Sequence, residues 1–281
     1  MTTQSGSATE SPAPVDAVHD PVIGAALLAG TANIIMQLAH PAVGYGVYES
    51  KVESGQIFRH PVKRSRTTLT YLVVATLATD EERALFGRGI NKAHAHVRST
   101  PSSPVAYNAF DPELQLWVAA CLYKGVEDTN AAFAPPLDDA AMERIYQEAS
   151  SFGTTLQVPR ERWPADREAF HRFWEESLAR ISIDDTIRHY LHDLAMLRFM
   201  PRFVSIPLGP LNRFITTGFL PQRVREEMRL PWDAARQRRF DVAMSALGAV
   251  TRRLPRPLRE FPLNTLLWDL RRRIRTGRPL V

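Results

Sequence analysis

The chain has 281 residues, of which 44% are apolar, so it can bury one large globular core. Its single cysteine, Cys121, excludes an internal disulfide framework, and a location in the reducing cytoplasm is expected. The charge is uneven, because residues 221–281 hold fifteen arginines and six acids, a net charge of +9, whereas the first 220 residues carry −4.

The basic C-terminal segment has two interpretations. It is either a solvated, Arg-rich helical end or a surface that makes peripheral contact with an anionic membrane. It contains no interleaved aromatic platform and no zinc-finger spacing, so nucleic acid is not expected as a partner.

The N-terminal region divides into a tail and an uncharged stretch. Residues 1–19 are rich in Ser, Thr, Pro and Ala, which predicts a disordered tail ahead of a helical domain at 20–281. Residues 21–48 contain no Asp, Glu, Lys or Arg, as in a membrane span or a buried helix. The polar residues within the stretch and the break at Pro41 favour a buried helix.

Helix signals recur along the whole domain. Asp20-Pro21 and Asp111-Pro112 each place an N-cap acid before a proline, and Thr79 with Glu82 forms a capping box. No segment shows the sustained alternation of a strand, so an all-α fold is predicted, a single helical domain with peripheral C-terminal helices. The expected helices cover residues 21–38, a stretch from 61 to about 77, and then 80–98, 112–133, 138–152, 164–181, 184–199, 221–229, 232–253 and 261–275.

Two of these helices carry candidate residues for a cofactor or catalytic site. Arg64 and Thr68 are four residues apart and share one helix face. Thr68 lies about 16 Å before the corner at Thr79 and His94 lies about 22 Å after it, at about 1.5 Å per residue. In an antiparallel pair of helices, these side chains therefore come within about 6 Å of the same level and can face one flat cofactor.

His94 and His96 cannot both serve one centre, because two residues correspond to about 200° around a helix. His94 shares its face with Ile90 and Val97, the more apolar side. A neutral imidazole on such a face is typical of an axial haem ligand, but from these residues alone a core histidine bonded to a carbonyl group is the favoured interpretation.

A rival metal site is a non-haem iron centre. Glu168 and His171 form a Glu-x-x-His pair of the type found in di-iron bundles, but a second such pair is missing from the sequence. Asp185, His189 and His192 have the spacing of a mononuclear site on one helix. No Gly-x-Ser-x-Gly, Walker or dinucleotide-binding pattern occurs in the sequence. A hydrolase, a kinase or a nicotinamide-dependent enzyme is therefore not expected.

Four motifs follow one another in the chain. They are His40-Pro41-Ala42-Val43, Arg64-x-x-x-Thr68-Leu69, Ala93-His94-Ala95-x-Val97-Arg98 and Asp111-Pro112-Glu113-Leu114-x-x-Trp117. Their order resembles the oxygenase family that includes the latex-clearing (rubber oxygenase) proteins and MpaB. The resemblance covers roughly residues 20–200, and its specificity comes from the ordered set. It implies an all-helical, globin-like core that holds haem b and cleaves isoprenoid double bonds with dioxygen.

The resemblance also assigns roles to individual residues. His94 matches the proximal haem ligand, Arg64 and Thr68 match the polar pair of the haem pocket, and Glu49 falls where the family has a candidate catalytic base. Thr67 stands where the latex-clearing branch has a lysine that can cap the iron, so neither lysine ligation nor rubber as substrate is expected. We therefore expect a haem-dependent oxygenase that acts on a small apolar, isoprenoid-like substrate, with a non-catalytic lipid- or haem-binding protein as the alternative.

Overall fold

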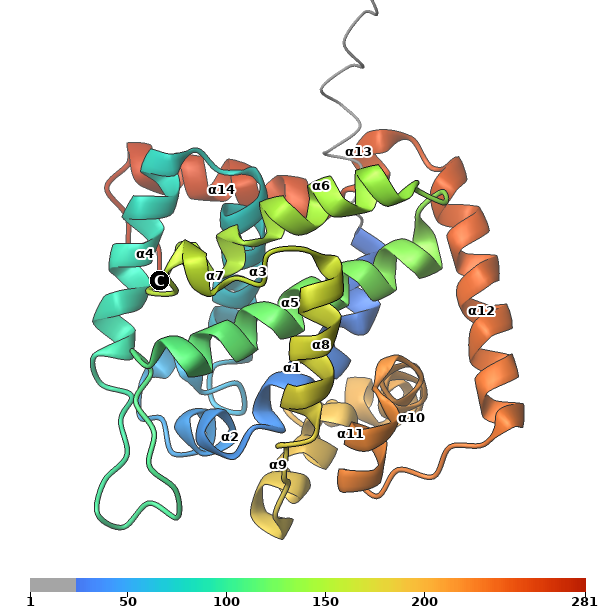
Figure 1. The fold of residues 1–281 in the computed structure, drawn as a ribbon, viewed down its shortest axis with the longest axis horizontal. Helices are drawn as coiled ribbons and strands as arrows, with labels where there is room; N and C mark the ends of the chain where they lie inside the picture. Colours follow the sequence, from blue (N-terminus) through green and yellow to red (C-terminus); the bar gives the residue numbers. More distant parts are fainter. Residues whose placement is uncertain (1–23) are drawn as a thin grey trace, which may run out of the picture.

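The computed structural model of the protein describes residues 24–281 (Figure 1). Within that range the backbone forms helices, with no strand and one isolated β-bridge between Arg98 and Asn108. The predicted all-α class is thus confirmed, while the expected tail at 1–19 lies outside the described residues. In chain order the helices are η2 (Gly24–Ala29), α1 (Gly30–Leu38), α2 (Pro41–Tyr48), η3 (Glu53–Gly55), α3 (Pro61–Leu77), α4 (Asp80–His94), α5 (Pro112–Phe133), α6 (Asp139–Ala149), α7 (Ser151–Thr154), η4 (Arg160–Arg162), α8 (Arg167–Leu178), α9 (Asp185–Ala195), α10 (Arg202–Phe219), α11 (Gln222–Glu227), α12 (Ala234–Arg253), α13 (Arg256–Arg259) and α14 (Leu263–Arg275).

The helix starts follow the local signals in the sequence. Thr79 accepts a hydrogen bond from the Glu82 amide, and the Glu82 carboxylate accepts one from the Thr79 amide at 3.0 Å. This reciprocal pair satisfies two amides that the first turn of α4 leaves without helical partners. Asp111 caps α5 with a single bond, which its side chain accepts from the Glu113 amide at 2.9 Å, and a proline occupies the next position. The turn between α3 and α4 is therefore fixed by local chemistry.

The core lies around α5, which crosses the middle of the molecule (Figure 1). Its side chains Trp117, Cys121 and Tyr123 are buried, and the helix contacts η2, α1, α7 and α12. Trp117 stacks on Trp174 of α8 with ring centroids 5.3 Å apart, and its indole donates to the carbonyl of Gln37 at 3.0 Å. These contacts hold α1 and α8 on one central helix.

The uncharged N-terminal stretch forms two helices with a sharp corner between them. No single helix in residues 24–281 is long and apolar enough to cross a membrane. The stretch Gly24–Leu38 with Pro41–Tyr48 meets the length and composition of a span, but the two parts bend by 108°. Pro41 occupies the first position of α2, and Ile35, Met36 and Leu38 of α1 are buried in the core. The stretch serves as core packing here.

Several expectations about helix boundaries are wrong. Residues 24–29 form a 3-10 helix where the pattern predicted continuous α-helix, and α4 and α9 each end four residues earlier than expected, at His94 and Ala195. Helix α10 lies in a segment for which no helix was predicted, and it contains Pro207 and Pro210. Both prolines are exposed, so the carbonyls that lose a helical donor can bond to water, and tertiary packing outweighs the local penalty.

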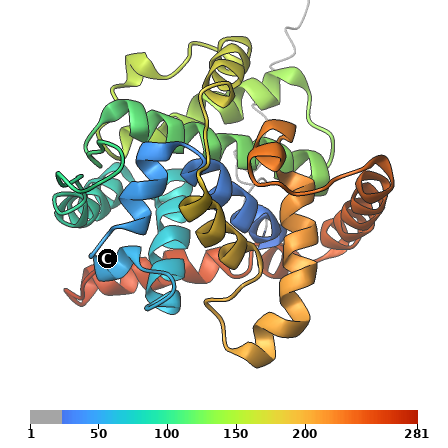
Figure 2. The ribbon, with the colours of Figure 1, turned by 90° about the horizontal axis from the view of Figure 1, so that it is seen from below.

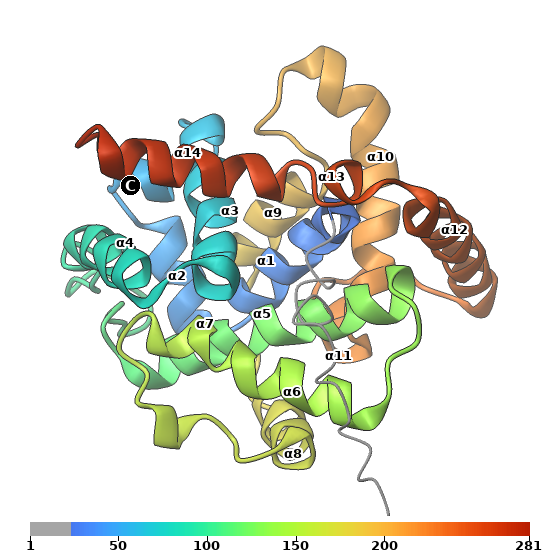
Figure 3. The same cartoon turned by 90° about the horizontal axis from the view of Figure 1, so that it is seen from above.

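The C-terminal helices cover the outside of the fold. Figure 3 shows α14 lying along α3, which is its most extensive partner, and α12 packing on α5 at the edge of the molecule. Leu270 of α14 is buried together with Val74 and Phe86 of α3 and α4. The helices α3, α4 and α14 therefore form one packed group beside α5.

Candidate functional site

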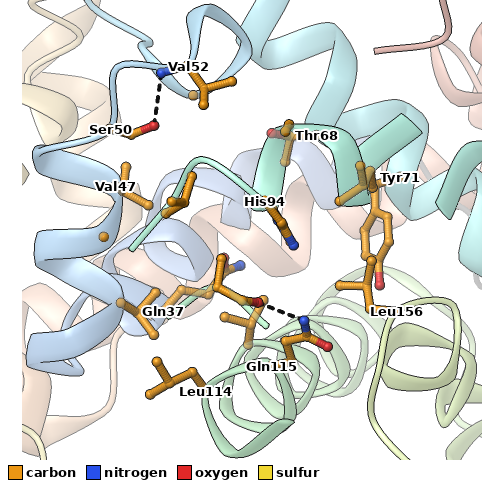
Figure 4. Close-up of a pocket in the computed structure, with 18 of the residues that line it drawn as sticks. Gln37, Val47, Ser50, Val52, Thr68, Tyr71, His94, Leu114, Gln115 and Leu156 are labelled. Atoms are coloured by element: carbon orange, nitrogen blue, oxygen red, sulfur yellow. Dashed lines mark hydrogen bonds between the residues drawn. The ribbon is translucent and has the colours of Figure 1, made fainter. Parts of the chain in front are cut away.

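A cavity of about 240 Å³ lies between α2, α3, α4 and the start of α5 (Figure 4). Its walls are mainly apolar, with contributions from Val47 of α2, Leu72 of α3, Ile90 of α4 and Val118 of α5. Val281, after α14, completes the wall. The cavity therefore has the mixture expected of a small-molecule site, an apolar lining with a few polar groups.

His94 is the last residue of α4, and Figure 4 shows its imidazole pointing into this cavity. Its Nδ1 is buried and has no hydrogen-bond partner within residues 24–281. Burial, helped by the positive charge of Arg64, lowers the pKa of His94 to about 4. At neutral pH the site thus presents a neutral imidazole with an unpaired nitrogen.

Arg64 and Thr68 reach the same cavity from α3. In the described part of the chain, no hydrogen bond or ion pair engages the Arg64 guanidinium, and burial lowers the pKa of Arg64. Thr67 also lines the cavity, but its hydroxyl donates to the Lys63 carbonyl at 3.0 Å. The expected convergence of Arg64, Thr68 and His94 on one cavity is therefore present, with an unpaired cation beside the histidine.

A second cavity, of about 320 Å³, adjoins the first. It runs between η2, α1, α3, α5 and α9, and its lining is again mostly apolar. Seven residues line both cavities, so the two form neighbouring chambers with a common wall. The shared residues are Gln37, Val47, Gly55, Arg64, Thr68, Leu72 and Leu122.

Glu49 lies behind the wall of the first cavity. It is the C-cap residue of α2, and it belongs to the described residues but lines neither cavity. One carboxylate oxygen accepts hydrogen bonds from Ser103 and Tyr107, each at 2.6 Å. Tyr107 does line the cavity, and burial followed by the bond to Glu49 raises its pKa. Glu49 therefore reaches the cavity only through Tyr107.

The competing histidines have other surroundings. His96 follows the end of α4 and is exposed. His171 lies 3.4 Å from Glu127, while Glu168 pairs with Arg172, and His192 contacts the Met228 carbonyl at 3.0 Å. Among the described residues, no group of three or more His, Cys, Asp or Glu side chains is placed to hold a metal ion. The non-haem iron alternative thus gains no support.

Several polar residues of the first cavity were not expected from the sequence, among them Tyr107, Tyr71 and Gln115. Tyr107 comes from the loop before α5, and Tyr71 of α3 donates to the Phe152 carbonyl. Gln115 donates to the Ala109 carbonyl at 2.7 Å, which fixes that loop to α5. Gln115 lies within the motif from Asp111 to Trp117 but at an unspecified position, so the motif did not identify it.

Comparison with known proteins agrees with this arrangement. Residues 19–249 match the family described as ER-bound oxygenase mpaB/B'/Rubber oxygenase, catalytic domain. The uncharacterized proteins Mb2261 of Mycobacterium bovis and Rv2237 of Mycobacterium tuberculosis are each 49% identical over 255 residues, which cover 91% of this chain and 100% of each relative. No solved structure matches the chain at a significant level. The chain, with its helical fold and its His94 cavity, belongs to the mpaB/rubber oxygenase catalytic-domain family.

Proposed function

We propose that the protein is a haem-b-dependent oxygenase that acts on a small apolar, isoprenoid-like substrate. The observation that carries the proposal is the His94 imidazole, which lines a largely apolar cavity and forms no hydrogen bond with any described residue. A buried polar atom without a partner is uncommon in native proteins and often indicates a site for an ion or ligand.

The residues of the first cavity fit a haem group. A neutral imidazole is the usual axial ligand of haem iron, and burial keeps His94 in that form. Arg64 offers an unpaired guanidinium, which suits the carboxylates at the edge of a haem. Bound haem would supply the dioxygen chemistry, and the protein would supply position and polarity.

The second cavity is suited to the substrate. Its lining from α1, α3, α5 and α9 is mainly apolar, and it meets the first cavity at Arg64 and Thr68. An isoprenoid-like chain held there would be desolvated, with one end at the shared wall. At the position where the latex-clearing branch has a lysine, this chain has Thr67, whose hydroxyl donates to the Lys63 carbonyl. The proposal does not include rubber as a substrate. It does include a cytoplasmic location for the protein.

The test compares two histidines on the same segment. Protein reconstituted with haemin should bind it stoichiometrically, His94→Ala should lose it, and His96→Ala should retain it. The two variants are matched, because they change the same residue type at positions two apart, and only His94 lines the cavity. Absorption spectra and pyridine haemochrome assays give the occupancy.

Oxygen uptake then separates catalysis from binding. With a reductant and squalene as test isoprenoid, the wild-type protein should consume dioxygen and release carbonyl products, and His94→Ala should not. Equal haem content in both histidine variants would contradict the ligand assignment. Haem binding through His94 without oxygen uptake on any apolar substrate would favour the alternative, a non-catalytic haem- or lipid-binding protein.

A further inference from the structure

The start of α10 turns an apolar face toward solvent. At about 100° per residue, positions 203, 206, 207, 210 and 211 fall within an arc of about 140°. Phe203, Ile206 and Leu211 on this arc are 80%, 63% and 55% exposed, and Pro207 and Pro210 between them are also exposed. The arc carries no charge. This is the reverse of an ordinary surface helix, whose apolar stripe faces the core.

The orientation of α10 is fixed by its other face. Gly209 packs so closely that a Cβ there would lie 2.6 Å from the Met196 carbonyl oxygen. Asn212 donates to the Ala195 carbonyl at 2.8 Å, and Thr216 is buried. The helix therefore cannot roll its apolar arc inward without losing these contacts.

The start of α10 carries one positive charge beside the arc. Residues 199–212 contain a single arginine, Arg202, and no acidic residue, whereas the flanking Arg198 and Arg223 are paired with Asp193 and Glu227. Arg202, at the first position of α10, is exposed and makes no ion pair with any described residue. A second copy docked by the same face would add a second unpaired Arg202 and no carboxylate to the contact, which disfavours a symmetric dimer. Anionic lipid headgroups complement this charge, and the acyl region complements the arc.

An aromatic cluster connects this region to the second cavity. Phe199, just before α10, lies 6.2 Å from Phe58 between ring centroids, and Phe58 lies 5.1 Å from Tyr190. Phe199 and Tyr190 line the second cavity, whereas Phe58 is 37% exposed. In Figures 2 and 3 the start of α10 projects from the body, and the segment after α2 and helix α14 lie toward the same side.

We propose that the α10 arc, defined as Phe203, Ile206, Pro207, Pro210 and Leu211, docks on an anionic lipid bilayer. The arc would enter the boundary between headgroups and acyl chains, with Arg202 among the lipid phosphates. The passage of an apolar substrate from the bilayer past the aromatic cluster into the second cavity rests on the proposed function. The docking itself does not, because it needs neither haem nor turnover.

Vesicle sedimentation tests the docking. Vesicles of phosphatidylcholine mixed with phosphatidylserine should bind the protein, and binding should weaken as salt rises. Phe203→Glu and Ile206→Glu should each lower the partition coefficient by about tenfold or more, since each places a charge in the apolar contact. Val242→Glu on α12 is the matched control, because Val242 is 71% exposed and lies outside the arc. All variants change exposed side chains, and circular dichroism verifies that they are folded.

Three outcomes would overturn the proposal. The first is the absence of binding to phosphatidylserine vesicles, and the second is equal binding by Phe203→Glu and the control. The third is self-association in analytical ultracentrifugation that Phe203→Glu abolishes, which would assign the arc to a second copy of the chain. Measurements on haem-free and haemin-loaded protein keep this result separate from the haem assignment.

Discussion

Arg64 is half-buried on the wall of two largely apolar cavities and has no partner among the described residues, which is an unfavourable place for a guanidinium. It lines both cavities, and within residues 24–281 no carboxylate pairs with it. Desolvation of an unpaired charge lowers the free energy of unfolding, and the reduced pKa of Arg64 has the same cause. The residue therefore fits an anionic ligand better than a purely structural role.

Arg64→Leu should separate these two roles. In haem-free protein we expect the melting temperature to rise by about 2–4 °C, because an apolar side chain replaces a half-buried cation that has no partner, which raises the free energy of unfolding by about 1 kcal/mol. Haemin affinity should fall by about tenfold or more, as a charge-assisted contact is lost. Arg66→Leu, on the same helix but outside both cavities, is the control. A lower melting temperature together with unchanged haemin affinity would show that Arg64 is structural.

Glu49 presents the opposite case, a carboxylate with partners outside the cavity. Glu49→Gln keeps an acceptor oxygen for Ser103 and Tyr107, so we expect haem content to stay the same and turnover to change by less than about tenfold. Glu49→Ala removes the acceptor and should release Tyr107 from its position. A loss of about 10²–10⁴-fold in Glu49→Gln with full haem content would instead support the catalytic base predicted from the sequence.

Within the site, residue spacing along the helices was sufficient to predict where some side chains lie and insufficient for others. Arg64, Thr68 and His94 lie on two helices joined by a locally coded turn, so their convergence follows from spacing alone. Glu49 and Tyr107 meet across 58 positions of sequence, between the end of α2 and the loop before α5. Nothing local specifies that pairing, because it depends on how Gln115 ties the loop to α5.

Among the elements, the same distinction separates the correct helices from the missed one. Capped starts such as Thr79 and Asp111 and apolar periodicity were enough to predict α3, α4 and α5. Helix α10 was missed because two prolines argue against a helix locally, while the contacts that hold it, such as Asn212 with the Ala195 carbonyl, are tertiary. Propensity is a weak prior wherever packing decides the outcome.

The segment after α14 is predicted to close the His94 cavity. Leu280 and Val281 pack on the apolar group formed by α3, α4 and α14, and Val281 lines the cavity beside His94. Deletion of residues 277–281 should lower the free energy of unfolding by about 1–2 kcal/mol, given that both side chains are only partly buried. It should also expose the cavity, so that haemin transfers to apomyoglobin faster than from the intact chain.

The control for this truncation is Arg278→Ala, which changes an exposed side chain in the same segment. It should leave both stability and haemin transfer as they are in the wild type. Unchanged haemin transfer in the truncated protein would mean that the segment contributes packing only and does not limit access to the cavity.

At the scale of the whole molecule, both cavities lie within the helical core. A ligand that fills them therefore binds the folded chain and not the unfolded chain. The first is lined by α2, α3, α4 and α5, and the second by α1, α3, α5 and α9. These walls come from segments between residues 26 and 281, and unfolding separates them completely. Haemin binding and global stability must therefore be linked.

The linkage gives a prediction with a definite size. At free haemin about 100 times its dissociation constant, the folded state should gain about 2.7 kcal/mol. For a chain of this length that corresponds to a rise in melting temperature of roughly 5–10 °C. Haemin also adsorbs to basic and apolar surfaces, so the shift alone is not specific to the cavity. His94→Ala should lose most of the shift and His96→Ala should keep it, because only His94 reaches the cavity. An equal rise in both variants would mean that haemin stabilises the protein from outside the core, and the cavity would then have to hold a different ligand.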